Sequence, residues 1–70
     1  MKHRQIIIGD YVITPIKNAF NDNYSYWMSK KGYMYAIYCF TPTAEEDLEF
    51  QLSDVVVKNY IDIFDNILKH

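Results

Sequence analysis

The fold is decided by residues 54–70, which read DVVVKNYIDIFDNILKH. At about 100° per residue, the apolar side chains of this stretch share one wide arc of a helix. The arc holds Val56, Val57, Tyr60, Ile61, Ile63, Phe64, Ile67 and Leu68, and only Val55 falls outside it. The pattern predicts an amphipathic helix over residues 54–69, with Ser53 or Asp54 as its cap and Lys69 near its negative end.

We expect this helix to be buried against a sheet of its own chain. The alternative is that part of the wide arc stays open and pairs with a second copy, since association helps a small core. The same helical wheel, continued backwards, places Glu46 and Glu49 within the apolar arc. One straight helix from 44 to 69 would bury these carboxylates unpaired, which is strongly unfavourable. We therefore predict a break near Ser53.

A short helix is predicted upstream of that break, at residues 43–52. Thr43 and Glu46 have the spacing of a capping box, and the acidic residues that follow Thr43 suit the positive end of a helix dipole. A strand is the alternative, because three apolar residues alternate with polar ones: Leu48, Phe50 and Leu52.

Residues 5–14 predict a first β-hairpin. Two β-prone runs flank Gly9-Asp10, a pair that suits a two-residue turn with glycine in the first central position. One long strand with a glycine bulge is the alternative. Pro15 lacks a backbone donor, so it marks a sheet edge or the end of the strand. The Asn- and Asp-rich residues 17–23 predict a loop.

Residues 24–40 predict a second hairpin. Two aromatic, β-prone runs flank Lys30-Lys31-Gly32, and the glycine supplies the positive φ that such turns require. A three-residue turn would place Trp27 opposite Tyr35, whereas a two-residue turn would place Trp27 opposite Ala36. A shift of one residue changes which side chains share a face, and the sequence leaves both registers open.

These elements predict an α+β fold in a single domain of residues 1–70. A small antiparallel sheet of two hairpins, at about 5–14 and 24–40, packs against the C-terminal amphipathic helix at about 54–69. The short helix at about 43–52 joins them. Half of the residues are apolar and 17% are aromatic, which supports a packed core rather than a disordered segment.

Localisation is predicted to be cytoplasmic. The longest aliphatic run, Ile6–Ile8, is far too short for a membrane span or for the apolar part of a secretory signal. The single cysteine, Cys39, has no partner in the chain for a disulfide, which suits a reducing compartment. We therefore expect no membrane association.

The two halves of the chain differ in charge. Residues 1–40 carry five cations against two carboxylates, a net charge of +3, and residues 41–70 carry two cations against seven carboxylates, a net charge of −5. One interpretation is that sheet and helices are each solubilised in their own way. The other is a basic face and an acidic face that meet different partners.

Catalytic, metal and cofactor sites are not expected. Cys39 lies within a strand among aromatic residues, which predicts a buried structural thiol, and the two histidines, His3 and His70, lie near the chain ends. The acidic cluster at 45–49 lacks the spacing of a calcium loop and predicts a solvated helix start. The chain also lacks a phosphate-binding glycine loop, so we predict that it is not an enzyme.

The aromatic second hairpin is the candidate binding surface. A helix covers only one face of a small sheet, so some of its rings must meet solvent or a partner, and Tyr and Trp suit interfaces. The candidate residues are Tyr24, Tyr26, Trp27, Lys30, Lys31, Tyr33 and Tyr35. The alternative is that these are ordinary strand residues, half of them in the core.

A resemblance is carried by two stretches, Tyr26–Gly32 and Tyr38–Thr41. From Gly9-Asp10-Tyr11 onward, the chain resembles short uncharacterised proteins of gut Gram-positive bacteria, often encoded near mobile elements. The resemblance implies a bacterial cytoplasmic protein that serves such an element as an accessory. It implies no enzymatic activity.

Two functions follow as hypotheses. The first is a small protein-interaction module, such as an accessory or inhibitor protein of a mobile element, with a protein partner and with a homodimer left open. The second is nucleic-acid binding through the aromatic, Lys-tipped sheet, where exposed rings would stack on bases. The sequence pI of about 5.5 makes nucleic acid the less favoured partner, because nucleic-acid binders normally carry a dense basic patch.

Overall fold

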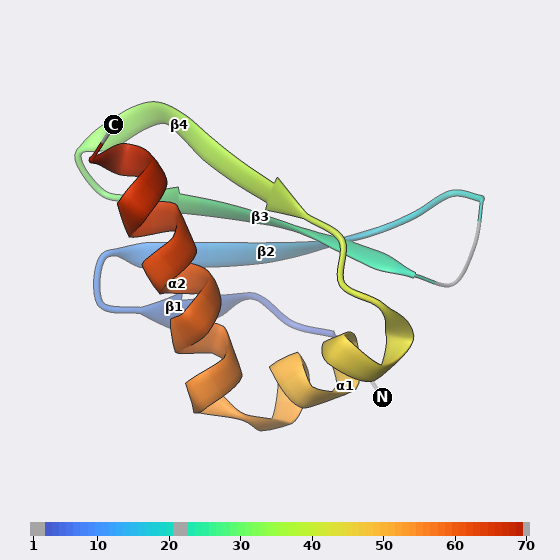
Figure 1. Ribbon diagram of the computed structural model, residues 1–70. Coiled ribbons are helices and arrows are strands. Elements are labelled where there is room, and N and C mark those ends of the chain that lie inside the picture. The colour runs from blue at the N-terminus through green and yellow to red at the C-terminus, as the bar shows by residue number, and fades with distance from the viewer. Residues whose placement is uncertain (1–2, 21–22, 70) are drawn as a thin grey trace.

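The computed structural model describes residues 3–20 and 23–69. It contains one antiparallel sheet of four strands in the order β1-β2-β3-β4, followed by two helices (Figure 1). The strands are β1 (Ile6–Ile8), β2 (Tyr11–Lys17), β3 (Tyr24–Lys30) and β4 (Tyr33–Phe40). The helices are α1 (Ala44–Leu52) and α2 (Asp54–Leu68). The predicted α+β fold is confirmed.

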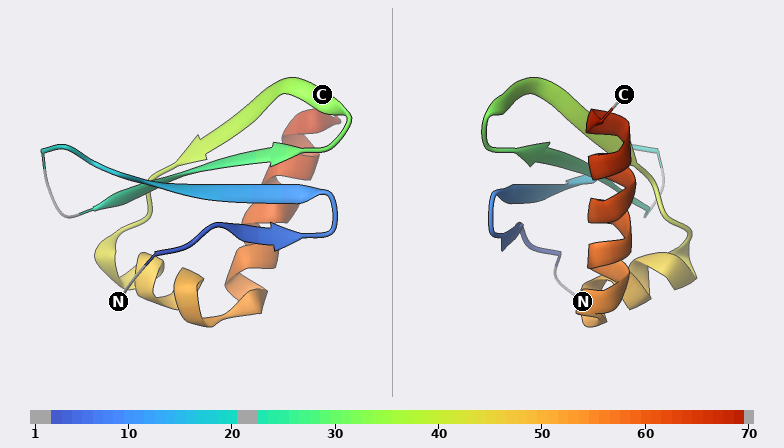
Figure 2. Two further views of the ribbon diagram at one scale, coloured as in Figure 1. Left: turned by 180° about the vertical axis from the view of Figure 1, so that it is seen from behind. Right: turned by 60° about the vertical axis from the view of Figure 1, so that its left-hand side comes forward.

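The two helices lie on the same face of the sheet. α2 crosses the strands steeply, and its C-terminal end comes close to the β3–β4 turn (Figure 1). Seen from behind, the sheet lies in front of the helices, and no described helix or strand covers its other face (Figure 2). The sheet is therefore a layer with one packed face and one open face, as antiparallel sheets often are.

The first hairpin forms with the predicted two-residue turn. Ile8 pairs with Tyr11 across Gly9-Asp10, and Gly9 has a φ of +56°. The alternative of one long bulged strand is therefore wrong. Pro15 lies within β2 and pairs with Tyr26 of β3, beyond the part of β2 that pairs with β1. Its missing N–H thus falls on a local sheet edge, the first of the two positions predicted for it.

The second hairpin adopts neither of the two registers considered from the sequence. A two-residue turn pairs Lys30 with Tyr33, but the register then shifts, and Trp27 pairs with Cys39. A bulge causes this shift because it adds residues to one strand only. The sequence gives no sign of it, since the added residues in β4 are as apolar as their neighbours.

The predicted break between the two helices is confirmed, and so is the predicted N-cap of α1. The Thr43 hydroxyl accepts from the Glu46 backbone N–H at 3.2 Å, and the Glu46 side chain accepts from the Thr43 N–H at 3.1 Å. The strand alternative for this segment is wrong. The helices are interrupted at Ser53, which precedes α2 without making a side-chain capping bond.

The core consists of apolar side chains from three strands and both helices. Its buried members are Ile13, Tyr26, Met28, Phe40, Phe50, Val57, Ile61 and Phe64. Aromatic contacts link the layers: the ring centroids of Tyr26 and Phe50 lie 4.6 Å apart, and those of Phe40 and Tyr60 lie 4.3 Å apart.

The apolar arc of α2 is only partly buried. Val57, Ile61 and Phe64 face the sheet, whereas Ile63 and Ile67 remain exposed. The helix thus packs against its own sheet as expected, and a strip of its arc stays open, as the alternative allowed. The arc is wider than the contact that one sheet face offers to a single crossing helix.

Candidate functional site

The uncovered face of the sheet is built from strand residues that alternate with the core residues. Successive side chains of a strand point to opposite faces, so every second residue faces away from the helices. Cross-strand pairing joins these residues into rows, one with Ile7, Val12, Ser29 and Ile37 and the next with Thr14, Trp27 and Cys39. We call this surface the open face. It consists of Ile7, Val12, Thr14, Ile16, Ser25, Trp27, Ser29, Ile37 and Cys39.

The open face is free of charged side chains, although 23% of the residues of the chain are charged. Trp27 is 49% exposed in the central part of this face, and Ile37 is 55% exposed beside it. Ile7 is also well exposed at the other end of the same row as Ile37. Contiguous exposed apolar surface is uncommon on small monomers and is typical of binding sites.

The turn between β3 and β4 forms a second exposed apolar group, residues 31–35, which we call the β3–β4 tip. Gly32 has a φ of +91°, and the register shift leaves Met34 and Tyr35 out of the pairing with β3. Met34 is 82% exposed and Tyr35 is 94% exposed. The tip therefore offers large apolar side chains to solvent next to the exposed cation Lys31.

The seven predicted site residues are divided between the two faces of the sheet. Trp27 belongs to the open face, and Lys31, Tyr33 and Tyr35 are exposed at the β3–β4 tip. The other three lie on the helix-covered side, so their prediction as one binding surface was wrong: Tyr24, Tyr26 and Lys30. Alternation separates even from odd positions of β3, and the sequence alone does not say which set faces the helices.

Cys39 is exposed, so the prediction of a buried structural thiol was wrong. It pairs with Trp27 and belongs to the open face. Its neighbours Tyr38 and Phe40 take the inward positions of β4, which places the thiol outside. Aromatic neighbours in the sequence of a strand therefore do not show that the residue between them is buried.

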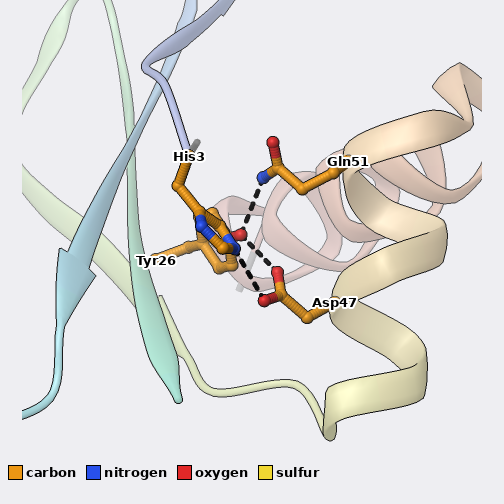
Figure 3. A network of polar contacts seen from close by, with 4 residues as sticks. All are labelled: His3, Tyr26, Asp47 and Gln51. Carbon is orange, nitrogen blue, oxygen red and sulfur yellow. Dashed lines mark hydrogen bonds and ion pairs between the residues drawn. The ribbon is translucent and has the colours of Figure 1, made fainter. Parts of the chain in front are cut away.

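A polar cluster joins α1 to the sheet and to the N-terminal segment (Figure 3). The buried Tyr26 hydroxyl donates to Asp47 Oδ1 and accepts from Gln51 Nε2 at 2.7 Å. His3 Nε2 contacts the other oxygen of Asp47 at 2.8 Å, and the His3 ring stacks on Tyr24 with centroids 3.6 Å apart. Burial, followed by the bond to Asp47, raises the pKa of Tyr26 well above its usual range.

This cluster holds the fold together where β3 and α1 meet. The Tyr26 side chain is fully buried, and its hydroxyl already makes both of its hydrogen bonds. His3 was expected at a frayed chain end, but it packs with its Nδ1 buried and without a hydrogen-bond partner among the described residues. Asp47 and Gln51 have the four-residue spacing of one helix face. The sequence offers no comparable signal for His3, which lies 44 residues from Asp47.

A second polar cluster joins the hairpin ends to α2. Tyr11 donates a hydrogen bond to Asp65 Oδ1, and Lys30 Nζ lies 3.4 Å from the same oxygen. Lys30 also lies 5.0 Å from the centroid of the Tyr11 ring. The bond from Tyr11, assisted by Lys30, lowers the pKa of Asp65, and the bond to Asp65 raises the pKa of Tyr11. Lys30 is thus engaged within the fold, whereas Lys31 points to solvent.

Comparison with protein-family models, curated proteins and solved structures found no match to this chain.

In residues 3–20 and 23–69, neither helix combines the length and apolar character that a bilayer crossing requires. In the same residues, histidine, cysteine and acidic side chains do not gather into a group of three or more that could hold a metal ion. Exposed apolar side chains gather on the open face and at the β3–β4 tip.

Proposed function

We propose that this protein is a small protein-interaction module, which binds a protein partner on the open face of its sheet and carries out no catalytic step of its own. The observation that supports this most is the uncharged open face with Trp27 exposed in its central part. Interface cores are depleted of charged residues, and Trp is among the residues that contribute most to binding energy.

The wide spread of exposed side chains over the open face favours a protein partner over a small molecule. The exposed side chains are spread over all four strands, from Ile7 in β1 to Ile37 in β4, instead of lining one deep cavity. Small-molecule sites are usually concave. A partner that presents a complementary apolar surface would remove Trp27 and Ile37 from water together, which is the main source of affinity for such a surface.

Nucleic-acid binding is the less favoured alternative because few cations are available on the sheet. The open face has none, and Lys30 is paired with Asp65 on the opposite face. Most of the affinity of nucleic-acid binders comes from Lys and Arg contacts to phosphates. Retention on DNA-cellulose at low salt, lost in Lys31→Glu, would favour the alternative over the proposal.

A role as an accessory or inhibitor protein of a mobile element, acting in the cytoplasm, is part of the same proposal. It rests on the resemblance to short proteins of gut Gram-positive bacteria. A protein of this kind acts by occupying a surface of its target, so binding alone is sufficient for its effect. The uncharged open face suits that mode of action.

Substitution by lysine tests the proposal with a matched control. Ile37→Lys places a charge on the open face, and Leu48→Lys makes the same change on α1, where Leu48 is 51% exposed. A partner captured from cells of the natural source by the wild-type chain should be lost with Ile37→Lys and kept with Leu48→Lys. Equal capture by all three chains would count against the open face as the binding site.

Trp27 provides a direct readout because it is the only tryptophan of the chain. Docking on the open face should shift its fluorescence emission to shorter wavelength and protect it from acrylamide quenching. A partner that binds without changing Trp27 fluorescence docks elsewhere, and the proposal would then be wrong.

A further inference from the structure

A groove between the two helices combines an apolar floor with an acidic rim. It has a volume of about 410 Å³ and is lined by Glu46, Glu49, Val56, Asn59, Tyr60 and Ile63. We call it the α1–α2 groove. The floor comes from the apolar arc of α2, in the part that the sheet leaves partly uncovered. Exposed apolar surface of this kind gains free energy when it is covered.

The acidic rim lacks a cation within the described part of the chain. Glu46 uses one carboxylate oxygen in the capping box, and neither Glu46 nor Glu49 forms an ion pair with a described residue. The negative charge of Glu46 also acts on Tyr60 in the groove and helps to raise the pKa of that phenol, after burial. A cation beside an apolar group is therefore the chemistry that would complement this groove.

The β3–β4 tip has this chemistry. Lys31 is exposed and forms no ion pair with a described residue, and Met34 and Tyr35 stand almost fully in solvent next to it. The two surfaces are thus complementary in both charge and apolar character.

One copy of the chain does not bring these two surfaces together. The β3–β4 turn lies near the C-terminal end of α2, whereas α1 and the start of α2 lie at the opposite end of the molecule in every view (Figures 1 and 2). Contact between them requires two molecules. We infer that the protein associates with a second copy of itself by placing the β3–β4 tip of one molecule in the α1–α2 groove of the other.

This self-association uses none of the nine residues of the open face. It therefore goes beyond the proposed function, and either can fail without the other. Ion pairs at the rim should make the contact sensitive to salt, because exposed charges are screened. The apolar part, from Met34 and Tyr35, should persist at high salt.

Sedimentation velocity of the full chain tests the inference over about 1 μM to 1 mM. We expect the mass of the wild type to rise above 8.4 kDa with concentration. Lys31→Glu and Glu49→Lys should each weaken association about tenfold or more, because each places like charges in contact. Lys17→Glu and Glu45→Lys are matched controls on exposed positions outside the tip and the groove, and both should associate as the wild type does.

A mixture of the two variants gives the sharpest result. In an equimolar mixture, the Lys31 tip of the Glu49→Lys chain meets the native groove of the Lys31→Glu chain. The introduced carboxylate at position 31 likewise meets the introduced ammonium at position 49. Association should therefore return to within about threefold of the wild type, although each variant alone is weak.

Three outcomes would overturn the inference. The wild type remaining at 8.4 kDa at all concentrations is one. Undiminished association of Lys31→Glu and Glu49→Lys is the second. The third is association that is lost in Ile37→Lys but unaffected by the tip and groove variants. That result would place self-association on the open face and leave the proposed protein-binding role of that face intact.

Discussion

Tyr26 connects the sheet to α1 and lies beside the N-terminal segment. Its ring packs against Phe40 and Phe50, and its hydroxyl bonds to Asp47 and Gln51. An ionised phenol in this position would be buried beside a carboxylate. The neutral form is therefore strongly preferred in the folded state, which is the cause of its raised pKa.

This preference predicts a loss of stability in alkali. A group whose pKa is higher in the folded than in the unfolded state stabilises the fold fully below the unfolded pKa of 10.0 and loses that contribution as pH rises above it. Urea midpoints should fall between pH 10 and 11. In Tyr26→Phe, which loses about 1–2 kcal/mol at pH 8 through its missing hydrogen bonds, the fall should be shallower. An equally steep fall in the variant would contradict this role of Tyr26.

The lowered pKa of Asp65 predicts a loss of stability in acid. Its pKa is lowered, first by the bond from Tyr11 and then by Lys30, so its contribution is present above the unfolded pKa of 3.8 and is lost as pH falls through the folded value. Asp65→Asn should be less stable than the wild type at pH 6, and the gap should close towards pH 2. Urea unfolding across this range measures the gap, with Asp62→Asn on the exposed side of α2 as the control.

At the scale of single residues, the sequence predicted which strands carry aromatic rings beyond those the core needs, but it predicted less well which of these side chains are exposed. The prediction that some aromatic rings of the second hairpin face solvent is confirmed, since Trp27, Tyr33 and Tyr35 are exposed. Tyr26 and Cys39 were assigned to the wrong sides because facing depends on strand register. For Cys39 the register is set by the shift between Ser29 and Lys30, which leaves no trace in the residue pattern. For Tyr26 the side depends on which set of alternating β3 side chains faces the helices.

At the scale of elements, the sequence predicted nearly all of the fold. The Gly9-Asp10 turn, the capping box at Thr43 and the break at Ser53 all depend on residues close in the chain, whose chemistry acts locally. The union of the two hairpins in one sheet was also predicted, whereas the anchoring of α1 by His3 and the exact pairing of β3 with β4 depend on distant contacts. Such contacts have no local sequence signal.

The N-termini of α1 and α2 are capped differently, so alanine substitutions at the two caps should change the free energy of unfolding by different amounts. Thr43→Ala removes the hydroxyl that accepts from Glu46 N–H and should lower the free energy of unfolding by about 1 kcal/mol. Ser53→Ala removes a side chain that makes no capping bond and should change it by less than about 0.5 kcal/mol. Urea unfolding of both variants measures the difference, and equal losses would show that Ser53 acts as a cap in solution.

At the scale of the whole molecule, the chain exposes more surface than its mass predicts. A monomer of 8.4 kDa is expected to expose roughly 4,600 Å², whereas this structure exposes 5232 Å². The open face, the β3–β4 tip and the flank of α2 at Ile63 and Ile67 contribute apolar area to this surface. Uncovered apolar area on three sides is consistent with a protein that works in contact with others.

The small core makes the fold sensitive to single large truncations. Phe64 is almost completely buried between α2 and the sheet, and its loss in Phe64→Ala should cost about 3–5 kcal/mol. The whole domain has roughly 4–10 kcal/mol available, so the variant loses a large part of its stability and should melt far below the wild type by circular dichroism. Ile67→Ala, three residues later on the same helix and 52% exposed in the wild type, should remain folded.

Binding of a partner should have the opposite effect and raise the stability of the fold. A protein that docks on the open face binds the folded state alone and stabilises it by an amount that grows with partner concentration. A saturating partner should therefore raise the melting temperature of the wild type and also that of Phe64→Ala, which keeps every residue of the open face. It should not raise that of Ile37→Lys. If the partner stabilised the wild type and Ile37→Lys equally, the docking surface would lie outside the open face.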